Sequence, residues 1–407
     1  MARMAPVIRW YYSIFSISTL SLGLGCDGGF VAAVNPPSPA SSFRDSLPPA
    51  TRDGDKLALY DTQVNLSLAL RSAAIKLTGD LPTGDEIKRV RSASDPLAEY
   101  TALIDSYLGR ATFAVQMIDF FQDTLKTGPY TGSPAGVNMS AAATFAAQLV
   151  VQGDDFTKLL TATSGTCPTY NATTNTFTDA ACVNAPVGIL SDAGVQSQFY
   201  SNMGFRRVRW VQETFMCAPF PAEIGPIKTR YPNGTFASPW DFLSISGSQN
   251  FPGPGKIDVD FHETSSTICA NCHVSLNHQS PLLANFDAVG KLQATIQVET
   301  PSTTTRKSKR IDWLPDSEGT AWRFGVPVSD LKAYGQAIVN DPGFAPCMAS
   351  RIWNWALSRG DVVADKVALT ENQARLLSTQ LVQAKWNLRA LIRSTFLSPE
   401  FIRYPIF

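Results

Sequence analysis

A mainly α-helical body with irregular loops and a minor β-hairpin is the fold that this sequence of 407 residues predicts. Apolar residues recur at helical spacing in several stretches before residue 216 and in others near the end of the chain. Segments rich in Pro, Gly and Ser separate these stretches. Strand-like alternation with many Thr residues occurs over Ile296–Ile311, where we expect a short hairpin.

The helices expected before residue 217 are separated by recognisable breaks. Thr83 and Glu86 have the spacing of a capping box, so a helix begins there. Asp95-Pro96 ends that helix, and Gly128–Gly136 is a turn-rich break. The other helical stretches in this part are Leu57–Leu77, Tyr100–Leu125, Ser140–Leu160 and Ser191–Met216.

Irregular structure and then further helices are expected after residue 217. Pro219 and Pro221 cannot continue the preceding helix, and Ile224–Phe261 is rich in Pro, Gly and Ser. Two or three helices close the chain, with Thr370–Phe396 the strongest pattern, Phe344–Leu357 the next and Leu331–Val339 the weakest. We therefore divide the folded body into a helical N-terminal domain, residues 56–216, and a C-terminal domain, residues 217–407.

The N-terminus has the features of an export signal. Two arginines precede the short apolar stretch Trp10–Leu24, which is too short for a comfortable membrane span. Leu22–Gly25 followed by Cys26 is similar to a lipobox, in which the cysteine is lipidated after cleavage. This pattern predicts a signal peptide at residues 1–25 and a lipid-anchored flexible linker at 26–55, rich in Pro, Gly and Ser. An ordinary signal peptide or an uncleaved anchor is the alternative.

The motif Cys269-Ala270-Asn271-Cys272-His273 carries the most chemical information in the chain. Two thiols at this spacing add to the two vinyl groups of one haem, and the adjacent histidine ligates the iron as its proximal ligand. The pattern therefore predicts one covalent haem c site. A redox dithiol, half of a zinc site and a loop disulfide compete with this interpretation. No second pair of zinc ligands lies at close spacing.

Four cysteines remain after lipid and haem attachment, and they allow three pairings. Cys167 and Cys182 bracket a loop rich in Thr and Asn, so we expect them to pair. Cys217 and Cys347 are then left for each other, unless some of the four are free buried thiols. Disulfides belong to oxidising compartments, which agrees with export to the periplasm or the outer cell surface.

Four ordered segments resemble the exported bacterial planctomycete-type cytochrome c family, whose members contain CxxCH and a domain of unknown function. The first is Leu77–Thr83 with the Tyr100–Phe121 region, and the second is Arg206-Arg207 through Glu213, Cys217 and Pro221. The third is the haem motif with Asn285-Phe286-Asp287 and Gly290. The fourth comprises Phe344, Cys347, Trp353–Leu357, Arg359-Gly360 and Ser398–Phe401. Leu276–Ser280 departs from the M-D-P-x-G sequence that relatives carry there. The resemblance implies a haem protein and names no substrate.

One histidine from the motif leaves the sixth position of the iron open. Methionine or histidine there suits electron transfer, whereas an open site allows binding or peroxide chemistry. The candidate distal ligands are His262, Met348, Met216, Met203 and His278. Core packing is the competing role for each methionine. Arg206 and Arg207 are candidates for the haem propionates, since Arg binds carboxylates bidentately, although a solvated helix face is the simpler interpretation.

These observations favour an exported monohaem cytochrome c that carries electrons to an unidentified redox partner protein. The alternatives are a haem-dependent oxidoreductase or peroxidase, or the haem subunit of a larger enzyme, and a surface binding or scaffold protein with a structural CxxC. We find no catalytic triad or nucleophile pattern, so we expect a carrier rather than a stand-alone enzyme. Basic and acidic residues balance at 34 each, which leaves no electrostatic signature of nucleic-acid binding.

Overall fold

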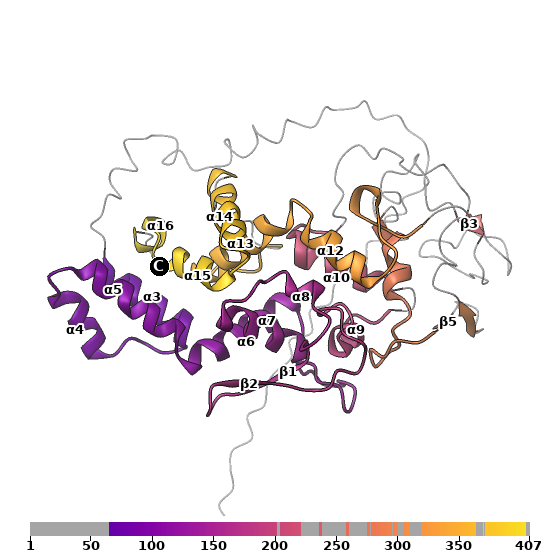
Figure 1. Cartoon of the computed structure of the whole chain (residues 1–407), viewed down its shortest axis with the longest axis horizontal. Helices are drawn as coiled ribbons and strands as arrows, with labels where there is room; N and C mark the ends of the chain where they lie inside the picture. The colour runs from indigo at the N-terminus through magenta and orange to yellow at the C-terminus, as the bar shows by residue number, and fades with distance from the viewer. Residues whose placement is uncertain are drawn as a thin grey trace, which may run out of the picture. The chain divides into compact units, whose positions relative to one another are not determined.

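Helix is the main secondary structure of the residues described by the computed structural model, at 58% helix and 6% strand, which places the chain in the mainly α class (Figure 1). The structure describes residues 65–201, 204–220, 236–237, 258–259, 275–276, 278–294, 296–299, 305–308, 319–363, 369 and 371–403. Thr62–Phe407 forms one compact unit. The predicted division near residue 217 stays a prediction.

The first half of this unit is a series of short helices joined by turns and longer loops. They are α3 (Leu66–Thr78), α4 (Gly84–Ser92), α5 (Pro96–Leu108), α6 (Ala111–Leu125), α7 (Ala141–Gln152), α8 (Lys158–Thr161), α9 (Ala193–Gln198) and α10 (Phe205–Met216). The capping box at the start of α4 is confirmed: Thr83 N donates to Glu86 Oε2 at 2.8 Å, and Glu86 N donates to Thr83 Oγ1 at 3.2 Å.

Four predicted helical stretches are each divided in two, namely Tyr100–Leu125, Ser140–Leu160, Ser191–Met216 and Thr370–Phe396. The predicted Tyr100–Leu125 helix becomes α5 and α6, because the chain leaves the helix at Gly109 and restarts at Ala111. The predicted Ser191–Met216 helix becomes α9 and α10, and Gly204 between them has a φ of 73°. A left-handed residue cannot continue a right-handed helix, so the chain changes direction there.

The strands form four separate two-stranded antiparallel ladders within the described part of the chain. The hairpin expected at Ile296–Ile311 is confirmed, with β5 (Ile296–Glu299) pairing with β6 (Thr305–Ser308). A second hairpin, which we did not predict from the sequence, lies between Cys167 and Cys182. The other strands are β1 (Pro168–Asn171), β2 (Thr176–Asp179), β3 (Phe236–Ala237), β4 (Asp258–Val259), β7 (Ala321–Trp322) and β8 (Val326–Pro327).

The C-terminal helices pack against the N-terminal ones, and both sets contribute side chains to one hydrophobic core (Figure 1). α15 contacts α5 and α7, while α13 and α16 contact α3. Tyr100 Oη donates to the carbonyl of Phe396 at 2.8 Å, which joins α5 to α15 inside the core. The helices concerned are α12 (Leu331–Val339), α13 (Phe344–Ala356), α14 (Glu371–Gln383), α15 (Leu388–Phe396) and α16 (Pro399–Arg403).

Asp192 caps the N-terminus of α9 from a fully buried position, and its pKa gives the fold a measurable pH dependence. Burial raises the pKa of this carboxyl to about 6, although hydrogen bonds from the backbone N–H groups of Val195 and Gly194 oppose that effect. A native pKa above the unfolded value means that the folded state holds the proton more tightly. The stabilisation of the folded state by protonated Asp192 is therefore complete below about pH 4 and is lost as pH rises through about 6.

We expect the protein to gain about 2–3 kcal/mol relative to Asp192→Asn when pH falls from 7 to 4. Asparagine can still cap the helix but does not titrate, so it isolates the effect of the carboxyl group. Urea unfolding of both proteins at several pH values measures this difference. Parallel stability curves for the two proteins would contradict the assignment.

Candidate functional site

The predicted haem motif, Cys269–His273, lies outside the described residues, as do Cys26, His262 and Met203. The site is therefore built from the described residues that flank the motif on both sides. These include two distal-ligand candidates on helices, two arginines and both predicted cysteine pairs: Met216, Met348, Arg206, Arg207, Cys167, Cys182, Cys217 and Cys347. His278 lies in the helical residues that follow the motif.

Both expected cysteine pairs are disulfides in the structure. Cys167–Cys182 has a Cα–Cα distance of 5.5 Å and encloses the β1–β2 hairpin. Cys217–Cys347 has a Cα–Cα distance of 5.1 Å and joins the end of α10 to α13. The second bridge holds the chain shortly before the segment, residues 221–274, that contains the predicted haem motif.

The described residues on either side of 221–274, the segment that contains the predicted haem motif, pack into the helical body. At the first end, Phe220 packs against the core and its N–H donates to Glu213 Oε1 at 3.2 Å. At the second end, Ser275 and Leu276 are buried. The helical body therefore holds the chain at both ends of the segment that contains Cys269–His273.

The helical residues after the motif pack tightly against α10 and α12. Tyr334 of α12 donates its hydroxyl to Gln279 Oε1 at 2.7 Å, and His278 beside it is only 1% exposed. A Cβ atom on Gly204 would lie 3.2 Å from Ala284, so these backbones approach closely. His278 is thus part of a packed layer and lies five residues after His273.

Arg207 joins α9, α10 and the segment after the haem motif through hydrogen bonds to backbone carbonyls. Its side chain is fully buried, and Nη1 donates to Leu283 O and Phe286 O, both at 2.9 Å. Nε and Nη2 donate to Gln196 O at 3.0 and 2.5 Å, and Nη2 also donates to Asp287 O at 3.2 Å. Burial lowers the pKa of Arg207 to about 10, so the group stays charged at neutral pH.

This hydrogen bonding bears directly on the predicted propionate contact of Arg207. Every guanidinium nitrogen of this side chain already donates to a carbonyl, so a propionate would have to replace backbone partners. Arg206, the residue before it, is exposed and lines a cavity of about 420 Å³. Arg209, Trp210 and Phe199 line the same cavity, and the rings of Phe199 and Trp210 stack at 5.2 Å. Of the two arginines, Arg206 is therefore the one placed to meet an external carboxylate.

The Asn285–Gly290 sequence forms a tight turn that is fixed by its own aspartate. Asp287 Oδ1 accepts from the N–H groups of Val289 and Lys291 at 3.0 and 2.9 Å. Asn184 donates to Gly290 O at 2.8 Å and accepts from Leu292 N at 2.9 Å. The turn is thus attached to the loop that follows the first disulfide.

Gly290 has no room for a side chain, so Gly290→Ala should lower the free energy of unfolding by about 2–4 kcal/mol. A Cβ atom there would lie 2.0 Å from Ala193 O, and the φ of 75° is already unfavourable for alanine. Gly84→Ala is the matched control, because a Cβ at Gly84 meets nothing within 4 Å. Denaturant unfolding of both variants tests this difference, and equal stabilities would contradict the placement of the turn.

Met216 and Met348 both lie in the core beside the Cys217–Cys347 bridge. Their exposed fractions are 8% and 4%. Met216 Sδ is 3.2 Å from the position of a Cβ on Gly343, which places it against the start of α13. In the structure both side chains serve as packing groups, and ligation of iron by either one stays a prediction.

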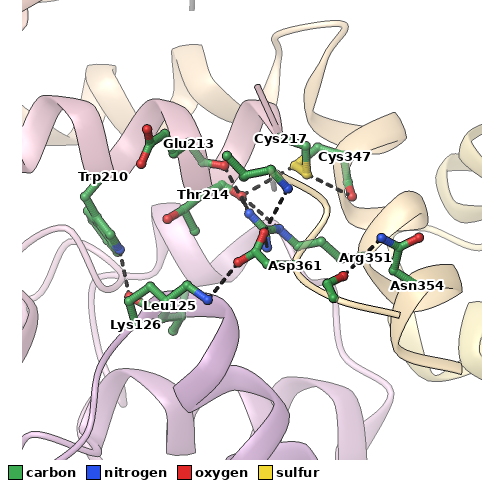
Figure 2. Close-up of polar contacts among 12 residues, drawn as sticks. Leu125, Lys126, Trp210, Glu213, Thr214, Cys217, Cys347, Arg351, Asn354 and Asp361 are labelled. Carbon is green, nitrogen blue, oxygen red and sulfur yellow. Dashed lines mark hydrogen bonds and ion pairs between the residues drawn. A yellow bond between two sulfur atoms is a disulfide. The ribbon is translucent and has the colours of Figure 1, made fainter. Parts of the chain in front are cut away.

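An ionic network that the sequence did not predict lies between α6, α10 and the segment after α13 (Figure 2). Arg351 is 5% exposed and donates through Nε and Nη2 to Thr214 O, at 3.2 and 3.0 Å, and through Nη2 to Glu213 O at 3.0 Å. Asp361 accepts from Arg351 Nη1 at 3.3 Å and pairs with Lys126 Nζ at 2.8 Å. Burial raises the pKa of Asp361, but the two cations outweigh it and hold that pKa below its ordinary value.

No family model, curated protein or solved structure matches this chain. Among the helices that the structure describes, none has the length and apolar character needed to cross a membrane. Within those same residues, no group of three or more His, Cys, Asp or Glu side chains is arranged to hold a metal ion.

Proposed function

We propose that this chain is an exported, lipid-anchored monohaem c-type cytochrome that transfers electrons to a partner protein. The observation that carries the proposal is Cys269-Ala270-Asn271-Cys272-His273. Two thiols and one imidazole at this spacing are the donor set that haem c requires. When bound, the haem would supply the one-electron chemistry, and the protein would supply attachment, burial and a docking edge.

Two structural features support this proposal. The disulfides Cys167–Cys182 and Cys217–Cys347 are typical of the oxidising compartment in which haem c is attached. The haem-bearing segment is also anchored at Phe220 and Ser275, so it is tied to a rigid helical body at both ends.

Each residue has a defined role in this proposal. Cys269 and Cys272 would form the two thioether bonds, and His273 would ligate the iron. Arg206, at the rim of the aromatic cavity, would meet a propionate, while Arg207 holds the following turn in place. Cys26 would carry the lipid, and residues 26–55 would be the tether to the membrane.

The proposal is tested by expressing the chain with haem-maturation machinery and staining a denaturing gel for haem peroxidase activity. Covalent haem remains with the polypeptide under these conditions, so the wild type should stain. The Cys269→Ser/Cys272→Ser variant should not stain. The Cys167→Ser/Cys182→Ser variant removes the same number of thiols outside the motif and should stain. Equal staining of all three proteins, or none in the wild type, would contradict the proposal.

Reversible reduction distinguishes an electron carrier from a scaffold with structural haem. A carrier should be reduced by a small donor such as ascorbate and reoxidised fully over repeated cycles. The sixth ligand distinguishes the carrier from a peroxidase, because an open site reacts with peroxide and a saturated one does not. If His262 ligates the iron, His262→Ala should change the absorption spectrum of the oxidised protein and Met348→Leu should leave it unchanged. If Met348 is the ligand, the opposite result is expected.

A further inference from the structure

A second cavity, separate from the aromatic cavity beside Arg206, lies where α3, α6 and α13 meet. Its volume is about 390 Å³, which falls in the range of small-molecule binding sites. The Arg351–Asp361–Lys126 network lines both cavities. This second cavity is composed of described residues alone, so its existence does not depend on the haem-bearing segment.

The charged side chains that line this cavity carry an excess of positive charge. Four are cations and two are carboxylates: Lys76, Lys126, Arg351, Arg359, Asp123 and Asp361. Arg351 and Lys126 already neutralise Asp361. Arg351 is further committed to the carbonyls of Thr214 and Glu213. These bonds make Arg351 a rigid part of the wall rather than a contact for a ligand.

Lys76 is the unusual member of this group. It projects from α3 as a half-buried side chain, and no ion pair or hydrogen bond joins its ammonium group to any residue that the structure describes. Burial lowers its pKa, and no neighbouring carboxylate offsets that effect. A half-buried cation without a partner destabilises the fold, so its presence at a cavity wall indicates a function.

An aromatic wall lies in the same cavity. Phe120 and Trp355 both line it, and their ring centroids are 5.3 Å apart. Trp355 is held from behind by Phe396 in an edge-to-face contact at 5.7 Å. A flat apolar group can pack against such a wall, while a charged group of the same ligand pairs with Lys76.

We propose that this cavity binds a small aromatic carboxylate, with its carboxylate paired to Lys76 and its ring against Phe120 and Trp355. The ligand neutralises the unpaired cation and covers the aromatic wall at the same time. A monoanion suits the site better than a phosphate ester, because Lys126 is engaged with Asp361, and Arg351 is engaged with Asp361 and with backbone carbonyls. This binding is independent of the proposed haem chemistry, and it can be measured whether or not haem is attached.

The proposal is tested by isothermal titration calorimetry of the full mature chain with benzoate. We expect binding at one site with a Kd of about 1 mM or tighter. Acetate, which has the charge without the ring, and benzyl alcohol, which has the ring without the charge, should each bind at least about tenfold more weakly. No benzoate binding, or equal binding of benzoate and benzyl alcohol, would overturn the proposal.

Two variants separate the role of Lys76 from a general effect of surface charge. Lys76→Met keeps the length of the side chain and removes its charge, so benzoate affinity should fall about tenfold or more. Lys88→Met changes an exposed lysine on α4 outside the cavity, and affinity should not change. Wild-type affinity in Lys76→Met would overturn the assignment.

Stability provides the second readout for the same variants. Because Lys76→Met removes a half-buried unpaired charge, its Tm should rise without ligand, while the increase in Tm caused by benzoate should be lost. If Lys76→Met fails to fold, Lys76→Gln serves for the same comparison. A lower Tm for a folded variant, with benzoate binding retained, would show that Lys76 has a structural role.

Discussion

Arg207→Met should lower the free energy of unfolding by about 3–5 kcal/mol, which is the largest effect that we expect from one side chain. The guanidinium group donates to the carbonyls of Gln196, Leu283, Phe286 and Asp287 inside the protein. Methionine fills a similar volume but donates nothing, so these buried acceptors lose their partners. Each buried acceptor without a partner costs about 1–3 kcal/mol, partly offset because the buried charge is removed as well.

Denaturant unfolding with an unchanged m-value measures this loss. Arg206→Met is the matched control, since the neighbouring arginine is exposed and should change stability by about 0.5 kcal/mol or less. Arg207→Lys should fall between the two, because one ammonium group cannot reach all four carbonyls. If Arg207→Met were as mild as Arg206→Met, the hydrogen bonds assigned to Arg207 would be wrong.

The loss at Arg207 should also extend to the segment that contains the CxxCH motif. The residues that Arg207 holds, Leu283–Asp287, begin ten residues after His273. Once they are released, the second anchor of the segment is weakened. We therefore expect faster hydrogen exchange at Leu283–Gly290 in Arg207→Met than in Arg206→Met, measured by mass spectrometry.

Removal of the Cys217–Cys347 bridge should cost about 5 kcal/mol, the second large effect. This bridge spans 130 residues, and closing so long a loop removes much entropy from the unfolded chain. The Cys167–Cys182 bridge spans only 15 residues, so its removal should cost about 3 kcal/mol. Both figures are upper values, because residual structure in the unfolded state reduces them.

The two double-serine variants are matched controls for each other, since each removes one disulfide and adds two hydroxyl groups. Guanidinium unfolding of Cys217→Ser/Cys347→Ser and Cys167→Ser/Cys182→Ser under oxidising conditions measures the difference. The long-range bridge should be the more costly one to lose. A larger loss from the short bridge would show that packing at the β1–β2 hairpin, rather than loop entropy, sets the stability.

Local signals in the sequence predicted most helix positions well. The capping box at Thr83 and Glu86, the Leu331–Val339 helix and the Ile296–Ile311 hairpin depend on neighbouring residues, and the structure contains all three. The cysteine pairs also agree with the structure, because a count of four thiols leaves few combinations.

The failures occurred where distant residues or unusual backbone angles decide the outcome. The predicted Thr370–Phe396 helix is interrupted between α14 and α15, where Lys385 and Trp386 have φ values of 54° and 60°. Neither residue type favours that conformation, so no local signal was present. The buried partners of Arg207 and the Arg351–Asp361–Lys126 network join segments far apart in the chain, and the sequence contains no pattern that brings them together.

The absorption spectrum of the matured protein tests the central claim most directly. After free haem has been extracted under denaturing conditions, the dithionite-reduced protein should retain the sharp α-band of haem c, because two thioether bonds hold the group. The same spectrum should disappear in Cys269→Ser/Cys272→Ser. Folded, matured wild-type protein without haem absorbance would contradict the cytochrome proposal and leave Cys269 and Cys272 as a dithiol or disulfide pair.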